Sequence, residues 1–165
     1  MNEEKEGRDD MKSQKSFREK LKKDDLPKIV DIPSKMQKRF GRGRMLIPNP
    51  LDVENIIRNV PYGKLVTMGM IREKLAREFS VNVTCPLTTG IFVRLIAEAA
   101  EEEKETGRKD ITPYWRVLKN DGSLNEKFPG GTEKQKEYLE KEGHSIIRKG
   151  EKYKVLNFEG SLVEL

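Results

Sequence analysis

An aromatic pair lies between a proline and an arginine in the second half of the chain, in the segment Pro113-Tyr114-Trp115-Arg116-Val117. A tyrosine hydroxyl with a pKa of about 10 is protonated at pH 7 and is a poor nucleophile. An aromatic ring can instead stack on a nucleobase, which is worth roughly 1–3 kcal/mol per base. We therefore predict no catalytic residue here, and we expect Tyr114 and Trp115 to bind a base or to fill the interior.

The remaining reactive side chains are isolated in the sequence. Cys85 is the only cysteine, so an intrachain disulfide is excluded and a reducing compartment is favoured. It lies where a helix is expected to start, which can lower a thiol pKa, but the same position suits a small buried core residue. His144 is the only histidine and has no neighbouring ligands, so we predict neither a metal site nor a cofactor.

The composition favours a polyanionic partner only weakly. Charged residues make up 37% of the chain and hydrophobic residues 35%, with a net charge of +5. The basic excess is diluted by many acidic residues. The sequence contains no apolar run that could span a bilayer, and its start lacks the apolar stretch of a signal peptide. We expect a cytoplasmic protein that does not enter membranes.

Hydrophobic residues are concentrated in the last two thirds of the chain. Residues 1–27 are almost all polar and predict a disordered tail, because they cannot repay their ordering entropy. Residues 28–48 predict a basic arm or linker; Arg42 and Arg44 can lie along DNA there, although a solvated linker is the alternative. Residues 49–158 predict the folded domain, and residues 159–165 a C-terminal tail.

Periodicity predicts four helices and a terminal hairpin within this domain. Asn49 and Thr67 are expected to cap the first two helices, and a third runs from Thr84-Cys85-Pro86 towards Gly107, ending in the solvated run Glu101–Glu105. Thr132 and Gln135 predict a capping box for the fourth. Alternation around Lys149-Gly150-Glu151 predicts a β-hairpin. The fold class is mainly α with a small C-terminal β-hairpin.

The second and third helices are joined by a short turn, which is typical of a helix-turn-helix. Most helix pairs of this kind simply pack together, so the pattern alone indicates DNA binding only weakly. If it binds DNA, the contacts come from the two helix starts. The candidates are Thr67, Leu87, Thr88, Thr89, Gly90 and Arg94.

Several short segments together resemble the O6-alkylguanine-DNA alkyltransferases. Pro113 to Val117 is similar to their active-site motif Pro-Cys-His-Arg-Val, and Val60-Pro61-Tyr62-Gly63 is similar to the segment entering their helix-turn-helix. Gly130-Gly131 and Glu142-Gly143-His144 resemble the closing segments, in the same order and at similar spacing. The resemblance implies a winged-helix-like DNA-binding domain over roughly Asn49 to His144.

The same resemblance implies that the acceptor cysteine is missing. Tyr114 stands at the cysteine position and Trp115 at the histidine position, so the chain is similar to the alkyltransferase-like branch, which binds alkylated guanine without repairing it and passes lesions to excision repair. Pro113, Arg116 and Glu142 are then structural. The arginine that enters the base stack in that family corresponds to Leu87, Thr88 or Thr89, with Arg94 as a later candidate, and a leucine there can act as an apolar wedge. The implied base pocket consists of Tyr114, Trp115, Val117, Phe128, Pro129 and Gly130.

Three functions follow from these expectations. The first is a non-catalytic, monomeric protein that binds double-stranded DNA, accepts a flipped and alkylated guanine, and assists an excision-repair partner. The second is a general DNA-binding or protein-interaction module in which Tyr114 and Trp115 plug the pocket. The third is a methyltransferase that uses a relocated nucleophile.

Overall fold

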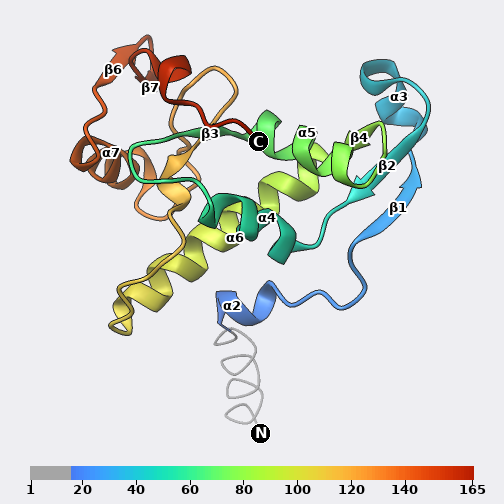
Figure 1. The fold of residues 1–165 in the computed structure, drawn as a ribbon, viewed down its shortest axis with the longest axis horizontal. Coiled ribbons are helices and arrows are strands. Elements are labelled where there is room, and N and C mark those ends of the chain that lie inside the picture. The colour runs from blue at the N-terminus through green and yellow to red at the C-terminus, as the bar shows by residue number, and fades with distance from the viewer. Residues whose placement is uncertain (1–15) are drawn as a thin grey trace, which may run out of the picture.

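The 20-residue helix α6 (Pro86–Glu105) runs diagonally through the molecule, and the other elements pack around it (Figure 1). The computed structural model describes residues 16–165. None of the helices described there is long and apolar enough to cross a membrane. The other helices are α2 (Phe17–Lys20), α3 (Ser34–Phe40), α4 (Pro50–Arg58), α5 (Met68–Glu78) and α7 (Gly131–Lys141). The strands are β1 (Lys28–Asp31), β2 (Arg44–Ile47), β3 (Val66–Thr67), β4 (Val83–Thr84), β5 (Val117–Leu118), β6 (Ile146–Lys149) and β7 (Lys152–Val155).

The predicted helices and the hairpin are confirmed, because local signals and buried faces agree. The Asn49 side chain accepts a hydrogen bond from the Leu51 amide, and the Thr67 hydroxyl accepts one from the Met70 amide at 3.2 Å. Strands β6 and β7 pair antiparallel from Ile146 opposite Val155 to Lys149 opposite Lys152. The fold is mainly helical with a small C-terminal hairpin.

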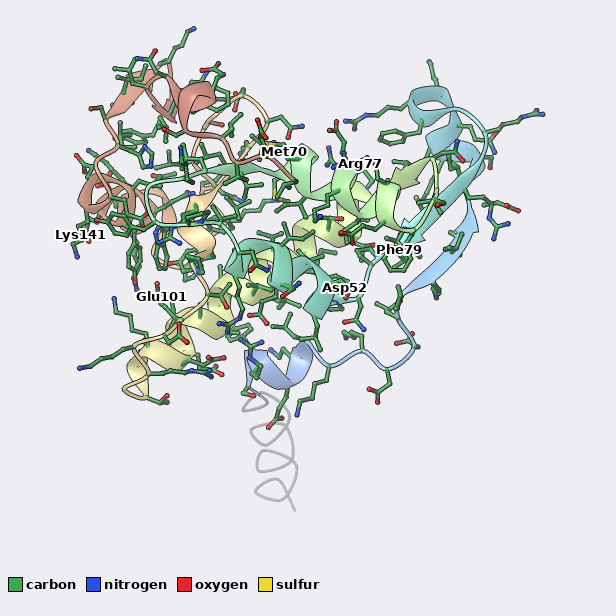
Figure 2. The ribbon with its side chains drawn as sticks, in the orientation of Figure 1. Asp52, Met70, Arg77, Phe79, Glu101 and Lys141 are labelled. Atoms are coloured by element: carbon green, nitrogen blue, oxygen red, sulfur yellow. The ribbon has the colours of Figure 1, made fainter. Side chains whose placement is uncertain are left out.

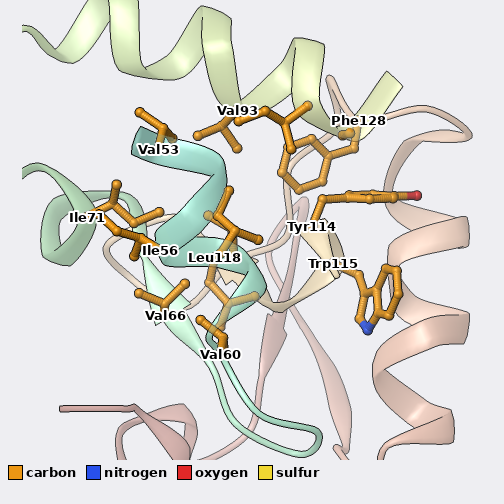
Figure 3. Packing of buried hydrophobic residues seen from close by; sticks show 14 of the residues in the cluster. Val53, Ile56, Val60, Val66, Ile71, Val93, Tyr114, Trp115, Leu118 and Phe128 are labelled. Atoms are coloured by element: carbon orange, nitrogen blue, oxygen red, sulfur yellow. The ribbon is translucent and has the colours of Figure 1, made fainter. Parts of the chain in front are cut away.

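The main core forms where α4, α5 and α6 meet the segment around Tyr114 (Figure 3). Val53 and Ile57 from α4, Ile71 from α5 and Val93 from α6 have no exposed surface. Burial of each such aliphatic side chain contributes about 1.5–3 kcal/mol. This core fixes α5 and α6 relative to each other, and it fixes the segment containing Tyr114 relative to α6.

The prediction of a capping box at Thr132 is wrong. Helix α7 begins after Gly130, whose φ is 76°. No side chain forms a capping hydrogen bond at this end of the helix. The Gln135 side chain is fully buried and accepts a hydrogen bond from the Asn125 amide at 2.8 Å. It also donates to the carbonyl oxygens of Trp115 and Val117. A buried amide satisfied in this way ties α7 to β5 and does not cap its own helix.

Residues 16–27 differ from the expected disordered tail, whereas residues 1–15 lie outside the described residues. Leu21 is fully buried in the main core, and Ser16 caps α2 by accepting a hydrogen bond from the Glu19 amide. Arg18 donates to both Glu54 on α4 and Glu103 on α6, at 2.6 and 2.7 Å. Leu21 and Arg18, together with the Phe17 amide that donates to Glu102 at 3.1 Å, hold this short segment against α6.

Residues 28–48 form a structured arm instead of a plain linker. Strand β1 pairs antiparallel with β2, and β2 pairs parallel with β4, the short strand between α5 and α6. Ile32, Met45 and Cys85 form a second small core beneath this sheet. Figure 1 shows the arm and the C-terminal hairpin at opposite ends of the molecule. The C-terminal residues are also bonded to the domain, since the Leu65 amide donates to the Ser161 carbonyl at 2.9 Å.

Candidate nucleic-acid interface

The start of α6 exposes an apolar surface that the core does not use. Leu87 is 72% exposed and Ile91 is 49% exposed, although both lie on a helix whose opposite face is fully buried. Beside them is an open cavity of about 360 Å³ between the start of α6 and residues 119–127. Arg94, Lys119 and Lys127 also line this cavity, together with Glu126, which pairs with Lys119 at 2.8 Å. The surface combines exposed apolar side chains with cationic ones, as a helix entering a DNA groove requires.

Two of the predicted DNA-contacting side chains are directed elsewhere. Thr67 is nearly buried as the cap of α5. Thr89 is fully buried, and its hydroxyl donates to the Cys85 carbonyl at 2.7 Å. Their side chains therefore serve helix geometry in this conformation. The helical period indicates the burial of Thr89, because residue 89 lies on the same face of the helix as the buried Phe92 and Val93.

The other predicted residues lie on accessible surface. Leu87 and Arg94 are exposed, while Thr88 and Gly90 are half-buried between them. The Thr88 hydroxyl donates to the Cys85 sulfur at 3.2 Å. Arg42 is exposed at the turn before β2, and Arg44 forms a loose, exposed ion pair of 3.8 Å with Asp31. Because β2 pairs with β4, these arm residues are attached to the turn of the helix-turn-helix.

The aromatic segment is buried and held by surrounding rings. Tyr114 has no exposed surface, and the ring centroids of Trp115, Phe128 and Tyr138 lie 5.5, 5.3 and 6.1 Å from its own, all nearly perpendicular to it. Figure 3 shows Phe128, Tyr114 and Trp115 arranged in this order along the core. Edge-to-face contacts of this kind are favourable. In this conformation the Tyr114 ring occupies the interior and offers no free face to a base.

A buried carboxylate holds the Tyr114 hydroxyl. Glu101 accepts hydrogen bonds from the hydroxyls of Tyr114 and Tyr138, and it pairs with Lys134 at 2.9 Å. Burial would raise the pKa of Glu101, but these hydrogen bonds outweigh it and lower that pKa. Burial, together with the hydrogen bond to Glu101, raises the pKa of Tyr114 far above its usual range. The phenol is therefore held protonated, which removes it as a nucleophile.

Sequence reasoning missed Glu101, because Glu101–Glu105 was predicted to be a solvated run. Figure 2 labels Glu101 on α6, and it is among the buried charged residues. Glu101 follows the fully buried Ala97 by four residues, so it continues the core-facing stripe. Its position on this stripe distinguishes Glu101 from Glu102 and Glu103, which are half-buried, and from the exposed Glu105.

A second carboxylate orders the turn around Trp115. Glu142 accepts hydrogen bonds from the Trp115 indole at 2.7 Å, from the Arg116 guanidinium at 2.9 Å and from the Gly63 amide at 2.9 Å. Arg116 also donates to the Val60 carbonyl at 2.7 Å. Burial would raise the pKa of Glu142, but the bonds from Arg116, Gly63 and Trp115 lower it. Arg116 and Glu142 thus form an ion pair that holds this turn against the segment around Val60 and Gly63.

The remaining residues of the predicted base pocket surround these rings. Val117 and Phe128 are buried, Pro129 is half-buried and Gly130 is exposed at the start of α7. Pro113 is buried directly before Tyr114. The structure thus brings the predicted residues together, with the Tyr114 and Phe128 rings filling the space between them.

Comparison with known proteins connects these features to one family. Residues 50–144 match the family model described as 6-O-methylguanine DNA methyltransferase, DNA binding domain. This match covers more than half of the chain and includes the helix-turn-helix, Tyr114 and Glu142. The chain belongs to this family. A comparison with curated proteins found no match.

Two solved structures from S. pombe are similar to this alkyltransferase-family chain. One is ATL in complex with DNA, with 22% identity and a TM-score of 0.51, covering 70% of this chain and 94% of that one. The other is Atl1 in complex with damaged DNA containing O6-carboxymethylguanine, with 22% identity, the same coverage and a TM-score of 0.49. At this identity the similarity to ATL supports the fold.

Proposed function

We propose that this protein is a non-catalytic member of the alkyltransferase family that binds double-stranded DNA through α5 and α6. The observation that carries the proposal is the exposed apolar and cationic start of α6, within a domain whose family is a DNA-binding one. The similar S. pombe ATL was solved with DNA, which supports the same partner here. Arg42 and Arg44 on the arm add phosphate contacts beside the turn.

Fluorescence anisotropy with a labelled duplex tests the DNA-binding surface. We expect saturable binding that Arg94→Glu weakens about tenfold or more, because the change replaces an attractive contact with phosphate repulsion. Lys149→Glu is the matched control, since it makes the same charge reversal at the exposed end of β6. Equal losses in both variants would show that net charge, and no particular surface, causes the binding.

Recognition of an alkylated guanine is the second candidate. The segment Pro113 to Val117 supports this function, because it stands at the position of the family's active-site motif. However, Tyr114 and Phe128 are packed against each other, and both rings must move before a base can enter. We therefore propose that the surface of α5 and α6 binds DNA without regard to the alkyl group, while the site around Tyr114 stays closed. Duplexes with guanine or O6-methylguanine should have similar Kd values. A preference of about tenfold or more for the lesion would establish a site that opens.

We further propose that alkyl groups are not transferred to this chain. The Tyr114 hydroxyl is engaged by Glu101, and Cys85 is buried beneath the arm sheet. Mass spectrometry after incubation with O6-methylguanine DNA should give an unchanged protein mass. A gain of one methyl group would instead support the relocated nucleophile. The monomeric state, a cytoplasmic location and an excision-repair partner stay predictions from the sequence.

A further inference from the structure

A second cavity lies at the other end of α6 from the proposed DNA-binding surface. It has a volume of about 330 Å³ and lies between the end of α6, the segment leading to Tyr114, and α7. An α-helix rises about 1.5 Å per residue, so the 20 residues of α6 place this cavity roughly 30 Å from the start of the helix. A duplex bound at the start of α6 therefore leaves this cavity accessible.

Two stacked rings and one aliphatic side chain form its apolar lining. The rings of Trp115 and Tyr138 are 4.2 Å apart and nearly parallel, and Ile111 lies beside them. The Trp115 indole N–H already donates to Glu142, and the Tyr138 hydroxyl already donates to Glu101. The polar atoms of both rings are thus engaged within the protein. Each ring covers one face of the other, the Lys104 ammonium lies over Tyr138 at 4.9 Å from its ring centroid, and the Arg116 guanidinium lies over Trp115 at 5.6 Å. A ligand therefore gains aromatic contact where the exposed Lys104 side chain moves off Tyr138.

Cations line the rest of the cavity. Lys104, Arg108 and Lys109 are all exposed there, and none of the described residues that line it carries a carboxylate. Lys104 donates to the Tyr138 hydroxyl at 2.8 Å, and Arg108 pairs with Glu103 at 3.0 Å. Among the described residues no carboxylate pairs with Lys109. The cavity therefore has a positive side next to an aromatic one, in which Arg108 is paired with Glu103 and Lys109 carries the charge that no described carboxylate neutralises.

We propose that this cavity binds a mononucleotide, whose base displaces the exposed Lys104 side chain from the face of Tyr138 and whose phosphate lies at Arg108 and Lys109. A planar base on this face extends the stack of Tyr138 on Trp115, and a phosphate matches adjacent guanidinium and ammonium groups. Small-ligand sites have volumes of about 300–1,000 Å³, so a cavity of 330 Å³ suits one nucleotide. The proposal is independent of DNA binding at the start of α6.

The single tryptophan of the chain provides a direct test, because all tryptophan fluorescence comes from Trp115. Titration of the full chain with guanosine 5′-monophosphate should change this fluorescence saturably. Guanosine, which lacks the phosphate, and ribose 5-phosphate, which lacks the base, should each bind at least about tenfold more weakly. Equal affinity for guanosine would overturn the phosphate site, and equal affinity for ribose 5-phosphate would overturn the stacking site.

A charge reversal identifies the cavity as the site. Lys109→Glu should weaken mononucleotide binding at least about tenfold, whereas the distant Lys149→Glu should leave it unchanged. Both residues are exposed, so circular dichroism should show two folded variants. Duplex DNA at saturation should leave the mononucleotide Kd unchanged. A lack of saturable binding, equal loss in both variants, or competition by the duplex would each overturn the proposal.

Discussion

Tyr114 shows how a single side chain can change the chemistry of an active-site motif. Its ring fills the space between Trp115 and Phe128, and its hydroxyl satisfies a buried carboxylate. The residue thus acts as a core residue that carries one polar contact. From the sequence, the loss of the nucleophile could be predicted, because it depends on residue type alone. Whether the Tyr114 ring fills the site could not be predicted, because that depends on Glu101 and Tyr138, which lie on other elements of the fold.

Tyr114→Phe should lower the free energy of unfolding by about 1–2 kcal/mol, because it removes one donor from the buried Glu101 carboxylate. Urea denaturation measures the change. Tyr62→Phe is the matched control: its hydroxyl donates to the Lys141 carbonyl at 2.8 Å but lies on the surface, so its loss should cost under about 0.5 kcal/mol. Equal effects of the two substitutions would contradict the role assigned to Glu101.

At the scale of elements, helices with strong local signals were predicted well and contacts between elements were not. Asn49 and Thr67 cap their helices as predicted, since a cap depends on residues two or three positions away. Gln135 was assigned to a local cap, whereas it bonds to β5 and to the Asn125 amide. The order of α2 also depends on distant partners. Such partners leave no periodic signal near the residue concerned.

Helix α2 gives a prediction at this scale. Arg18→Ala should lower the free energy of unfolding by about 2 kcal/mol, because Glu54 is nearly buried and would lose its bidentate partner. Chemical denaturation provides the measurement. Arg44→Ala removes an exposed ion pair of 3.8 Å and should cost under about 0.5 kcal/mol. A small effect of Arg18→Ala would show that the other contacts of this segment, such as the burial of Leu21 and the bond from the Phe17 amide to Glu102, hold it without the arginine.

The whole molecule has charged surfaces at both ends of α6 and three buried carboxylates between its elements. The basic residues of the arm and of the start of α6 are assigned to DNA, and those around Trp115 to a smaller anion. Arg42, Arg44 and Arg94 were predicted from the sequence as DNA contacts, whereas the basic residues around Trp115 were not, because basic and acidic residues are mixed throughout the chain. Folding places these basic residues on two separate surfaces, one at each end of α6.

Salt dependence tests the arm. Arg42→Ala should reduce the slope of log K against log salt concentration by about 0.9, the contribution of one phosphate contact. Lys149→Ala, at the opposite end of the molecule, should leave the slope unchanged. An unchanged slope for Arg42→Ala would mean that the arm does not touch the phosphates.

Acid should destabilise the fold in two stages. Burial lowers the pKa of His144 below 6.5, so the unfolded chain binds a proton first and stability declines as the pH falls below about 6.5. Hydrogen bonds lower the pKa values of Glu54, Glu101 and Glu142 below their usual 4.5. Their stabilisation is present above that pH and is lost as the pH falls through the folded values. Urea midpoints measured across this range should decline on acidification, and a rise would contradict these shifts.

The pairing of β2 with β4 has a consequence for synthesis on the ribosome. The arm emerges early, yet its small core needs Cys85, and its sheet needs the hydrogen bond from the Cys85 amide to the Leu46 carbonyl. Contacts that span some forty residues form only after the later partner has emerged. A nascent chain ending before β4 therefore carries an arm without its third strand, and the arm can take its final form only when the turn of the helix-turn-helix has been made.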